Sequence, residues 1–310
     1  MHIGTIKEIW RYPVKSMAGE RLESCTVESL GILADRGWAL RDETTGEITN
    51  GKRFPLLMRC AAQYRSEPTG ADIPPADITL PDGSKTATDA ADINQRLTEL
   101  LGKPMTLWPR LPANDLEHYR RKSKAARVFG RLAKVRALRS ALPTLASFGN
   151  ANAELRTMFS REPNEPIPDI SLLPPELMEF TSPPGTYFDA FTIHLLTTSS
   201  LKIMERLNPA AIWDARRFRP NFLIESELKG LIELEWNLQK LQIGSAVLKC
   251  QIPTARCGMT THAQKDLPKD PSVLRTIVKD ADQNLGIYAS VVSAGRVAVN
   301  DTVELLGGRH

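Results

Sequence analysis

Four short phrases of the sequence carry side chains that could do chemistry together. They are residues 12–16 (YPVKS), 35–38 (DRGW), 216–221 (RRFRPN) and 254–261 (TARCGMTT). Three arginines within four residues can bind phosphate through paired guanidinium contacts. The thiol of Cys257 follows an arginine and is flanked by hydroxyl groups, which suits a reactive thiolate and a soft metal ion. Together these groups favour a bound anion and a soft metal.

Each phrase also has a purely structural interpretation. The first is compatible with a strand end that carries a solvated Lys15 and a turn residue Ser16, and the second with a turn that holds a local ion pair. The three arginines can form a solvated charge run. A lone cysteine such as Cys257 is more often a small buried hydrophobe than a ligand. The residues alone therefore leave both interpretations open.

Composition and missing motifs narrow the function classes. The 310 residues carry a net charge of +4, and because the basic residues are mostly dispersed we expect no nucleic-acid partner. The five histidines are scattered, which disfavours a histidine-based zinc site. The sequence shows no dinucleotide or phosphate-loop motif, no HExxH and no GxSxG. With no targeting pattern and no run of 18 apolar residues, we expect a cytoplasmic protein.

The four cysteines bear on redox chemistry. Cys25, Cys60, Cys250 and Cys257 show no CxxC spacing and are too few for a disulfide scaffold. An iron–sulfur cluster of the two-iron type needs four thiolates. The chain therefore cannot hold such a cluster of its own and still spare Cys257.

Short strands separated by glycine turns predict a mainly β fold with some helix, an α+β protein built around an antiparallel barrel. Strand-like stretches are 3–10, 22–27, 193–196, 222–224, 238–243, 246–250 and 288–292, and 295–306 suggests a hairpin around 299–301. Helical spacing covers 93–101, ending at Gly102, and 199–207, with Thr198 or Ser199 as its N-cap. Residues 112–186 differ from both flanks, with a basic stretch and then a proline-rich run from 163 to 184. We therefore divide the chain into 1–111, an insertion and linker at 112–186, and 187–310.

In order and spacing, the four phrases resemble the MOSC family, whose members include the mitochondrial amidoxime-reducing component and its bacterial relatives. The stretch 188–201 (FDAFTIHLLTTSSL) is similar to the start of the family's second domain. The resemblance covers about residues 3–60 and 187–307. It implies a MOSC N-terminal β-barrel-like domain at 1–111 packed on a MOSC antiparallel β-barrel at 187–310, with a helical insertion between them.

The resemblance also implies a cofactor and its site. A molybdenum cofactor, molybdopterin with molybdenum, would lie between the two parts, and the thiolate of Cys257 would be both the metal ligand and the catalytic group. Basic side chains that match Lys15, Arg36 and Arg219 would bind the anionic phosphate of the cofactor. The remaining cofactor-binding positions are Ser16, Thr198, Ser199, Asn221, Thr254 and Arg256, with Arg256 supporting the thiolate and Thr198 and Ser199 at a helix start that favours anions.

These implications support three functional hypotheses. The first is a molybdenum-dependent oxidoreductase that reduces small N-hydroxylated, amidoxime-type compounds with electrons from an external donor protein of the ferredoxin or cytochrome type. The second is a carrier or transfer protein for sulfur or for the molybdenum cofactor, which would use a persulfide or the thiolate of Cys257. The third is a binding module without catalysis.

Residues 118–139 contain nine lysines or arginines and no acidic residue. We predict an exposed basic helix there, with a modest apolar stripe. In the structural interpretation the helix is solvated and rests on the body of the protein. In the functional one it docks an acidic electron-transfer partner, with an anionic membrane surface as the alternative.

Overall fold

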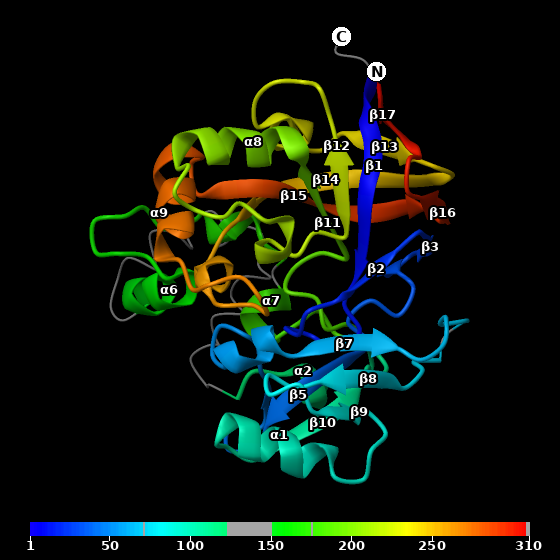
Figure 1. Ribbon diagram of the computed structural model, residues 1–310, viewed down its shortest axis with the longest axis vertical. Helices are drawn as coiled ribbons and strands as arrows, with labels where there is room; N and C mark the ends of the chain where they lie inside the picture. The colour runs from blue at the N-terminus through cyan, green and yellow to red at the C-terminus, as the bar shows by residue number, and fades with distance from the viewer. Residues whose placement is uncertain (71, 123–150, 175, 308–310) are drawn as a thin grey trace.

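The computed structural model describes residues 1–70, 72–122, 151–174 and 176–307, which form two β-rich parts, one above the other in Figure 1. The upper part is a closed barrel of seven strands. In order around the ring they are β12 (Phe222–Glu225), β11 (Ile193–Thr197), β15 (Asn284–Ser293), β14 (Ala246–Ala255), β13 (Lys240–Ile243), β17 (Thr302–Leu306) and β1 (His2–Arg11). The ring closes because β1 pairs with both β17 and β12. The N-terminal strand therefore completes the barrel that the C-terminal half of the chain builds.

The barrel is antiparallel, as predicted, with one exception. β11 and β12 run parallel, and helix α8 (Thr198–Leu207) lies in the connection between them. A parallel pair needs such a crossover because a tight turn cannot return the chain to the same end of the sheet. The fold class predicted from the sequence, mainly β with some helix, is confirmed.

The burial pattern of β1 explains why its sequence alternates only in part. Ile3, Ile6 and Ile9 are all buried in the barrel core, although they lie three residues apart. Register shifts interrupt the pairing of β1 with β17 and with β12. Each extra residue reverses the alternation of inward and outward side chains. A spacing of three therefore keeps the isoleucines on the inside.

The lower part holds two small sheets and a helix. One sheet contains β5 (Trp38–Asp42), β6 (Glu47–Ile48) and β10 (Met105–Pro109), and the other contains β7 (Ala61–Tyr64), β8 (Ala76–Thr79) and β9 (Lys85–Ala87). Helix α1 (Ile93–Leu101) and the 3-10 helix η1 (Pro55–Arg59) bury apolar residues against these sheets. As predicted, α1 ends at Gly102, which has the left-handed backbone that favours glycine.

A third small sheet joins the ends of the chain. It contains β3 (Ser24–Glu28), β4 (Gly31–Ile32) and β16 (Gly295–Ala298). The predicted strand 22–27 is thus two strands, because β2 (Glu20–Leu22) pairs with β1 while β3 pairs with β16. The predicted hairpin at 295–306 is wrong for the same reason. β16 pairs with β3, whereas β17 pairs with β13 and β1.

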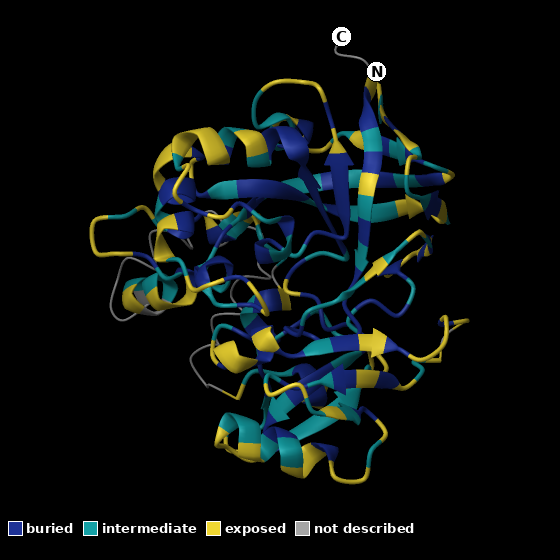
Figure 2. Cartoon of the chain, viewed as in Figure 1, coloured by how far each residue is buried: buried dark blue, intermediate teal, exposed yellow. Residues whose placement is uncertain are grey.

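Helices cover one side of the barrel. Met204 of α8 and Ile277 of α9 (Pro271–Asp280) are buried in one apolar cluster with Leu196 of β11. The sequence patterns predicted α8 but missed α9. Figure 2 shows exposed residues along the outer side of α8, while the barrel strands are mostly buried or half-buried. Shorter 3-10 helices lie in the connections, namely η3 (Ala215–Arg217), η4 (Ile232–Trp236) and η5 (Gly258–Thr261).

The middle segment, between 112 and 186, contributes α2 (Leu116–Tyr119), α6 (Ala151–Phe159), η2 (Ile170–Leu172) and α7 (Glu176–Glu179). The predicted basic helix at 118–139 is wrong for its first residues, because α2 ends at Tyr119 and Arg120 is extended and bridges to Phe180. Residues 123–139 lie outside the described part of the chain. Tyr119 and Phe180 are buried against the lower part, so both ends of this segment are packed. The division at 111 and 186 stays a prediction.

None of the helices that the structure describes is both long enough and apolar enough to cross a membrane.

Candidate functional site

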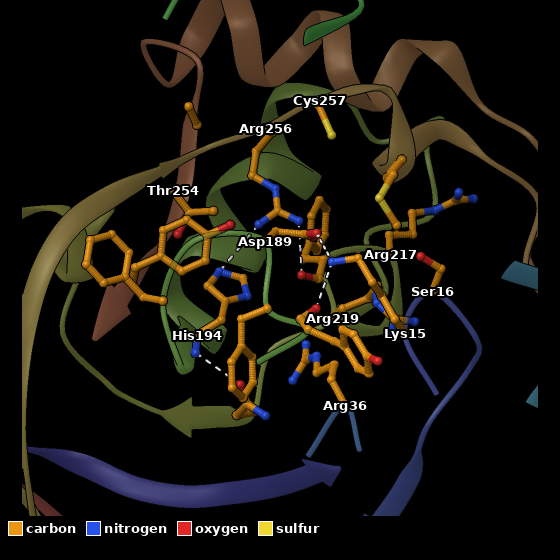
Figure 3. Close-up of a pocket in the computed structure, with 18 residues that line it drawn as sticks. Lys15, Ser16, Arg36, Asp189, His194, Arg217, Arg219, Thr254, Arg256 and Cys257 are labelled. Carbon is orange, nitrogen blue, oxygen red and sulfur yellow. Dashed lines mark hydrogen bonds and ion pairs between the residues drawn. The ribbon is translucent and has the colours of Figure 1, made fainter. Parts of the chain in front are cut away.

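The four phrases meet at a cavity between the two parts of the molecule (Figure 3). It is lined by all of the predicted site residues except Thr198 and Ser199, namely Lys15, Ser16, Arg36, Arg219, Asn221, Thr254, Arg256 and Cys257. Figure 3 shows Cys257 at one side of the cavity and Arg36 at the opposite side, with Asp189 between them. Residues separated by more than 200 positions in the chain therefore share one site.

Three residues with a strained backbone lie at this cavity. Ser16, Arg36 and Arg219 all have positive φ angles, of 70°, 50° and 54°. Residues other than glycine adopt this conformation only at a cost, and such strain collects at functional sites. The hydroxyl of Ser16 accepts a hydrogen bond from the backbone N–H of Gly51 at 2.8 Å, so the protein already uses one of its lone pairs.

The ring of Tyr12 contacts the guanidinium groups of Arg36 and Arg219. The guanidinium carbons of Arg36 and Arg219 lie 4.4 and 4.1 Å from the centre of its ring. Arg219 also donates to the carbonyl of Met17 at 2.6 Å. Burial lowers the pKa of Arg219 to about 10, an effect that the neighbouring Arg36 strengthens. Two like charges held close together in low dielectric favour the binding of an anion.

Lys15 has a partner within the protein. Its ammonium group donates to the carbonyl of Tyr187 at 2.7 Å and to the carboxylate of Asp189 at 2.6 Å. Burial lowers the pKa of Lys15, and Asp189 restores it only in part. Desolvation by the surrounding protein raises the pKa of Asp189. Lys15, Arg36 and Arg219 have the larger, opposite effect and lower this pKa to about 2. The Asp189 side chain is 62% exposed, so solvent or a ligand can reach it through the cavity.

Asn221 ties three of the elements together. Its amide nitrogen donates to Asp35 at 2.7 Å, and its amide oxygen accepts the backbone N–H of His194 at 3.1 Å. The other oxygen of Asp35 accepts the N–H of Tyr12 at 2.7 Å. We predicted that Asn221 would bind phosphate or pterin. The structure commits its amide to the protein, so its visible role is to hold the cavity wall in register.

Cys257 stands apart from the other cysteines. It is half-buried at the start of η5, whereas Cys25, Cys60 and Cys250 are buried. Thr260 fixes its carbonyl with a hydroxyl hydrogen bond of 3.0 Å. In the described part of the chain no group of three or more His, Cys, Asp or Glu residues could hold a metal ion. Protein side chains therefore offer one sulfur ligand here and not a complete coordination shell.

Two buried polar atoms at the cavity have no protein partner. They are Oγ1 of Thr254 and Nε of Arg256. The other nitrogens of Arg256 contact the carbonyl of Phe218 at 3.0 Å and Nε2 of His194 at 3.4 Å. Buried polar atoms are normally satisfied by protein or by ordered water, so these two are available to a ligand or a water molecule in the cavity.

Sequence reasoning missed His194 and Asp189. Burial, with a contribution from Arg256, holds the pKa of His194 well below its usual value. A guanidinium can only donate, so the contact with Arg256 requires Nε2 of a neutral imidazole as acceptor. Both residues lie in the 188–201 stretch that resembles the family. The available signal was an acidic residue, Asp189, just before an apolar strand and a titratable residue, His194, within that strand.

The structure separates Thr198 and Ser199 from the other predicted site residues. The helix α8 begins one residue earlier than we predicted, with Thr197 as its N-cap. The hydroxyls of Thr197 and Ser200 donate to the buried carboxylate of Glu233 at 2.7 and 2.6 Å. The hydroxyl of Ser199 donates to the carbonyl of Gly230. The carboxyl group in contact with the start of this helix is therefore the protein's own Glu233.

Comparison with known proteins agrees with this architecture. The MOSC N-terminal beta barrel domain matches residues 3–104 and the MOSC domain matches residues 184–304. The chain is 24% identical to mitochondrial amidoxime reducing component 2 of Bos taurus, over 97% of this chain and 83% of that protein. Among solved structures, the YuaD protein of Bacillus subtilis aligns with a TM-score of 0.42 and 11% identity over 97% of this chain and 94% of that one. YiiM of Escherichia coli aligns with a TM-score of 0.31 and 16% identity over 41% and 60%. The chain belongs to the MOSC family, with a MOSC N-terminal β-barrel domain followed by a MOSC domain.

Proposed function

We propose that the cavity binds a molybdenum cofactor and that the protein is an oxidoreductase for small N-hydroxylated compounds, with electrons supplied by an external donor protein. One observation carries the proposal: the half-buried thiol of Cys257 lines a cavity that also holds Lys15, Arg36 and Arg219. The bovine relative, whose name describes it as an amidoxime reducing component, supports the choice of substrate class.

The residues present fit such a cofactor. Its phosphate is anionic, and the cavity carries two arginines beside Tyr12. Arg36 forms an ion pair with the buried carboxylate of Asp35, whereas Arg219 forms no salt bridge within the described part of the chain and donates to a backbone carbonyl. Its polar ring edge could satisfy the two unpartnered atoms of Thr254 and Arg256. Its metal already has ligands from the cofactor itself, so one soft thiolate from Cys257 is a sufficient contribution from the protein.

Each residue would then have a definite task. Cys257 would bind the metal, and Arg36 and Arg219 would hold the phosphate. The two-electron chemistry is supplied by the bound cofactor. The neutral imidazole of His194 and the carboxylate of Asp189 lie in the cavity as groups able to hold a proton or orient a polar ligand.

Elemental analysis tests this function directly. Protein purified from a host that makes the cofactor should contain molybdenum and should reduce an amidoxime with an artificial reductant. Replacement of Cys257 by Ser should abolish turnover and lower the molybdenum content, because a serine hydroxyl is a harder and far less acidic ligand. The matched control is Cys250→Ala in the buried barrel core, which should keep both properties at a cost of about 1 kcal/mol in stability.

Two outcomes would redirect the assignment. A persulfide on Cys257, detected by mass spectrometry in protein that holds no molybdenum and turns over no amidoxime, would favour the carrier of sulfur or cofactor. A Cys257→Ser variant with full molybdenum content and activity would rule out the thiolate as the ligand.

A further inference from the structure

The segment 156–165 contacts the loop that carries Cys257, although it lies outside both matched domains, which cover 3–104 and 184–304. Helix α6 ends at Phe159, and Ser160 then turns the chain with a φ of 55°. Arg161 follows and is only 6% exposed. Arginine is rarely buried to this degree unless its donors are used, so its contacts are informative.

The guanidinium of Arg161 uses each of its nitrogens. Nη2 donates to the carbonyl of Arg256 at 2.9 Å, and Nε donates to the side-chain oxygen of Gln283 at 3.1 Å. Nη1 donates to the carbonyl of Phe159 at 2.8 Å. The backbone N–H of Arg256 in turn donates to the carbonyl of Gln283 at 2.9 Å. Arg161 and Gln283 therefore hold both backbone groups of the residue that precedes Cys257.

The residue that follows Cys257 is also in contact with this segment. A Cβ atom on Gly258 would lie 2.3 Å from the hydroxyl oxygen of Ser160. A glycine at position 258 therefore lets these two segments of the chain approach this closely. The segment 156–165 thus packs against the backbone on both sides of Cys257. We name it the cysteine clamp.

The cysteine clamp is itself anchored on two sides. Arg275 of α9 donates to the carbonyl of Ser160 at 2.6 Å and forms an ion pair with Glu165. On the other side, the ammonium group of Lys52 donates to the carbonyl of Met158. The clamp therefore connects the Cys257 loop to helix α9 and to the N-terminal part.

The charge of Arg161 is not neutralised by a direct partner. No carboxylate in the described part of the chain forms a salt bridge with it. Burial lowers the pKa of Arg161, while Glu165 and Cys257 act in the opposite direction. A buried cation without a paired anion is costly, and a bond network that uses every nitrogen offsets part of that cost.

We propose that Arg161 is a positioning residue for Cys257: by fixing the backbone of Arg256 and the side chain of Gln283, it holds the loop so that the thiol faces the cavity. The inference rests on the proposed role of Cys257 as metal ligand. Arg161 does not line the cavity, so it would act through the loop and not by touching a ligand.

Hydrogen exchange measured by mass spectrometry tests this proposal on the metal-free, full-length protein. In Arg161→Gln, amides in 254–262 should exchange about tenfold faster, because both tethers of Arg256 are loosened. Exchange in β13 and β17 should not change. Molybdenum content after expression in a cofactor-competent host should fall about tenfold, as for other residues that orient a ligand. Arg296→Gln, which removes an exposed guanidinium at the edge of β16, is the matched control and should behave as wild type.

Other results would overturn the proposal. They are unchanged exchange in 254–262 together with unchanged molybdenum content, or faster exchange spread equally over the barrel, which would make Arg161 a general stabilising residue. If Arg161→Gln does not fold, Arg161→Lys replaces it, because lysine keeps the charge but not the fork of donors. In Arg161→Lys, the amide exchange rate in 254–262 should then rise about threefold, while the exchange rate in β13 and β17 stays unchanged. Wild-type exchange in 254–262, or equally faster exchange throughout the barrel, would refute the proposal.

The Cys257→Ser variant separates this proposal from the proposed function. If Cys257→Ser keeps its molybdenum, the ligand role of Cys257 fails whatever Arg161 does. If Cys257→Ser loses molybdenum while Arg161→Gln keeps it and exchanges normally, the ligand role stands and the positioning role fails.

Discussion

At the residue scale, the described lining of the cavity pairs several cations with one acidic side chain. Asp189 contacts Lys15 directly, and its pKa is also lowered by Arg36 and Arg219. A ligand anion would meet the same cations. Asp189 therefore stabilises the protein when no anion is bound and competes with an anion that arrives.

Replacing Asp189 with Asn should separate these two effects. The free energy of unfolding without ligand should fall by about 1 kcal/mol, because the buried ammonium of Lys15 loses its counter-charge while solvent screens part of the loss. Affinity for inorganic phosphate should rise. Thermal unfolding and calorimetry with phosphate measure the two changes. An exposed aspartate, Asp280, is the control, and weaker phosphate binding by Asp189→Asn would contradict the competition.

His194 should make the protein acid-sensitive. Its pKa lies well below the usual 6.5 because of burial and Arg256. Well above pH 6.5 the imidazole of His194 is neutral in both the folded and the unfolded state. As the pH falls below about 6.5, the unfolded chain binds a proton that the folded protein does not, so stability falls by up to about 1.4 kcal/mol per pH unit.

The variant His194→Gln should lose this contribution. Urea unfolding between about pH 5 and 7 should show a smaller loss of stability on acidification than in wild type. The exposed His2 provides the control variant, which should keep the full slope. An identical slope in His194→Gln and wild type would mean that His194 is protonated in the folded protein.

At the element scale, the N-terminus of α8 is a closed structural unit. Thr197 caps the helix and also donates to Glu233, whose pKa burial raises. The hydroxyl of Thr198 accepts the backbone N–H of Ser226. The backbone N–H of Ser200 donates to the Thr197 hydroxyl, and the hydroxyls of Thr197 and Ser200 contact Glu233 of the same chain.

Substitutions at this helix test its role. Thr197→Val should lower the free energy of unfolding by about 2 kcal/mol. The substitution removes the N-cap of α8 and also the hydroxyl that donates a hydrogen bond to the buried Glu233. Molybdenum content per folded protein should not change. Ser199→Ala should also keep its molybdenum. A selective loss of molybdenum in Ser199→Ala, without a change in the melting temperature, would restore the anion-binding role that we predicted for it.

At the scale of the whole molecule, the two parts of the chain are interlocked. β1 belongs to the N-terminal matched region, yet Ile3, Ile6 and Ile9 are buried in the barrel of the C-terminal region. Backbone packing at the seam is close, because a Cβ on Gly4 would lie 1.9 Å from the carbonyl of Glu225. The MOSC barrel therefore needs the start of the chain to close.

A fragment comprising residues 184–310 should accordingly fail to fold on its own. Without β1, the edges of β12 and β17 are unpaired and the apolar barrel core is open. Circular dichroism should show no cooperative melting transition for the fragment, whereas the full chain melts cooperatively. Gly4→Ala in the full chain should lower stability by about 3 kcal/mol. A fragment that melts like the full chain would show that the barrel closes without β1.

The sequence by itself determined the chemical groups and the class of fold. Short strands, turn glycines and one thiol among basic phrases are local properties, and local pattern specifies secondary structure and the supply of functional groups. The resemblance of the phrases to the MOSC family, in their order and spacing, identified Lys15, Arg36, Arg219 and Cys257 as site residues, and the structure brings them to one cavity.

The tertiary structure alone decided which groups face that cavity. Asp189 and His194 enter it because β11 is placed next to β15 and β12, whereas α8 directs the hydroxyls at its start toward Glu233. β1 crosses into the distant barrel, and Arg161 reaches the Cys257 loop from a segment that carries no family motif. Contacts of this kind join residues far apart in the chain. They depend on strand register and packing, which no local pattern of residue types encodes.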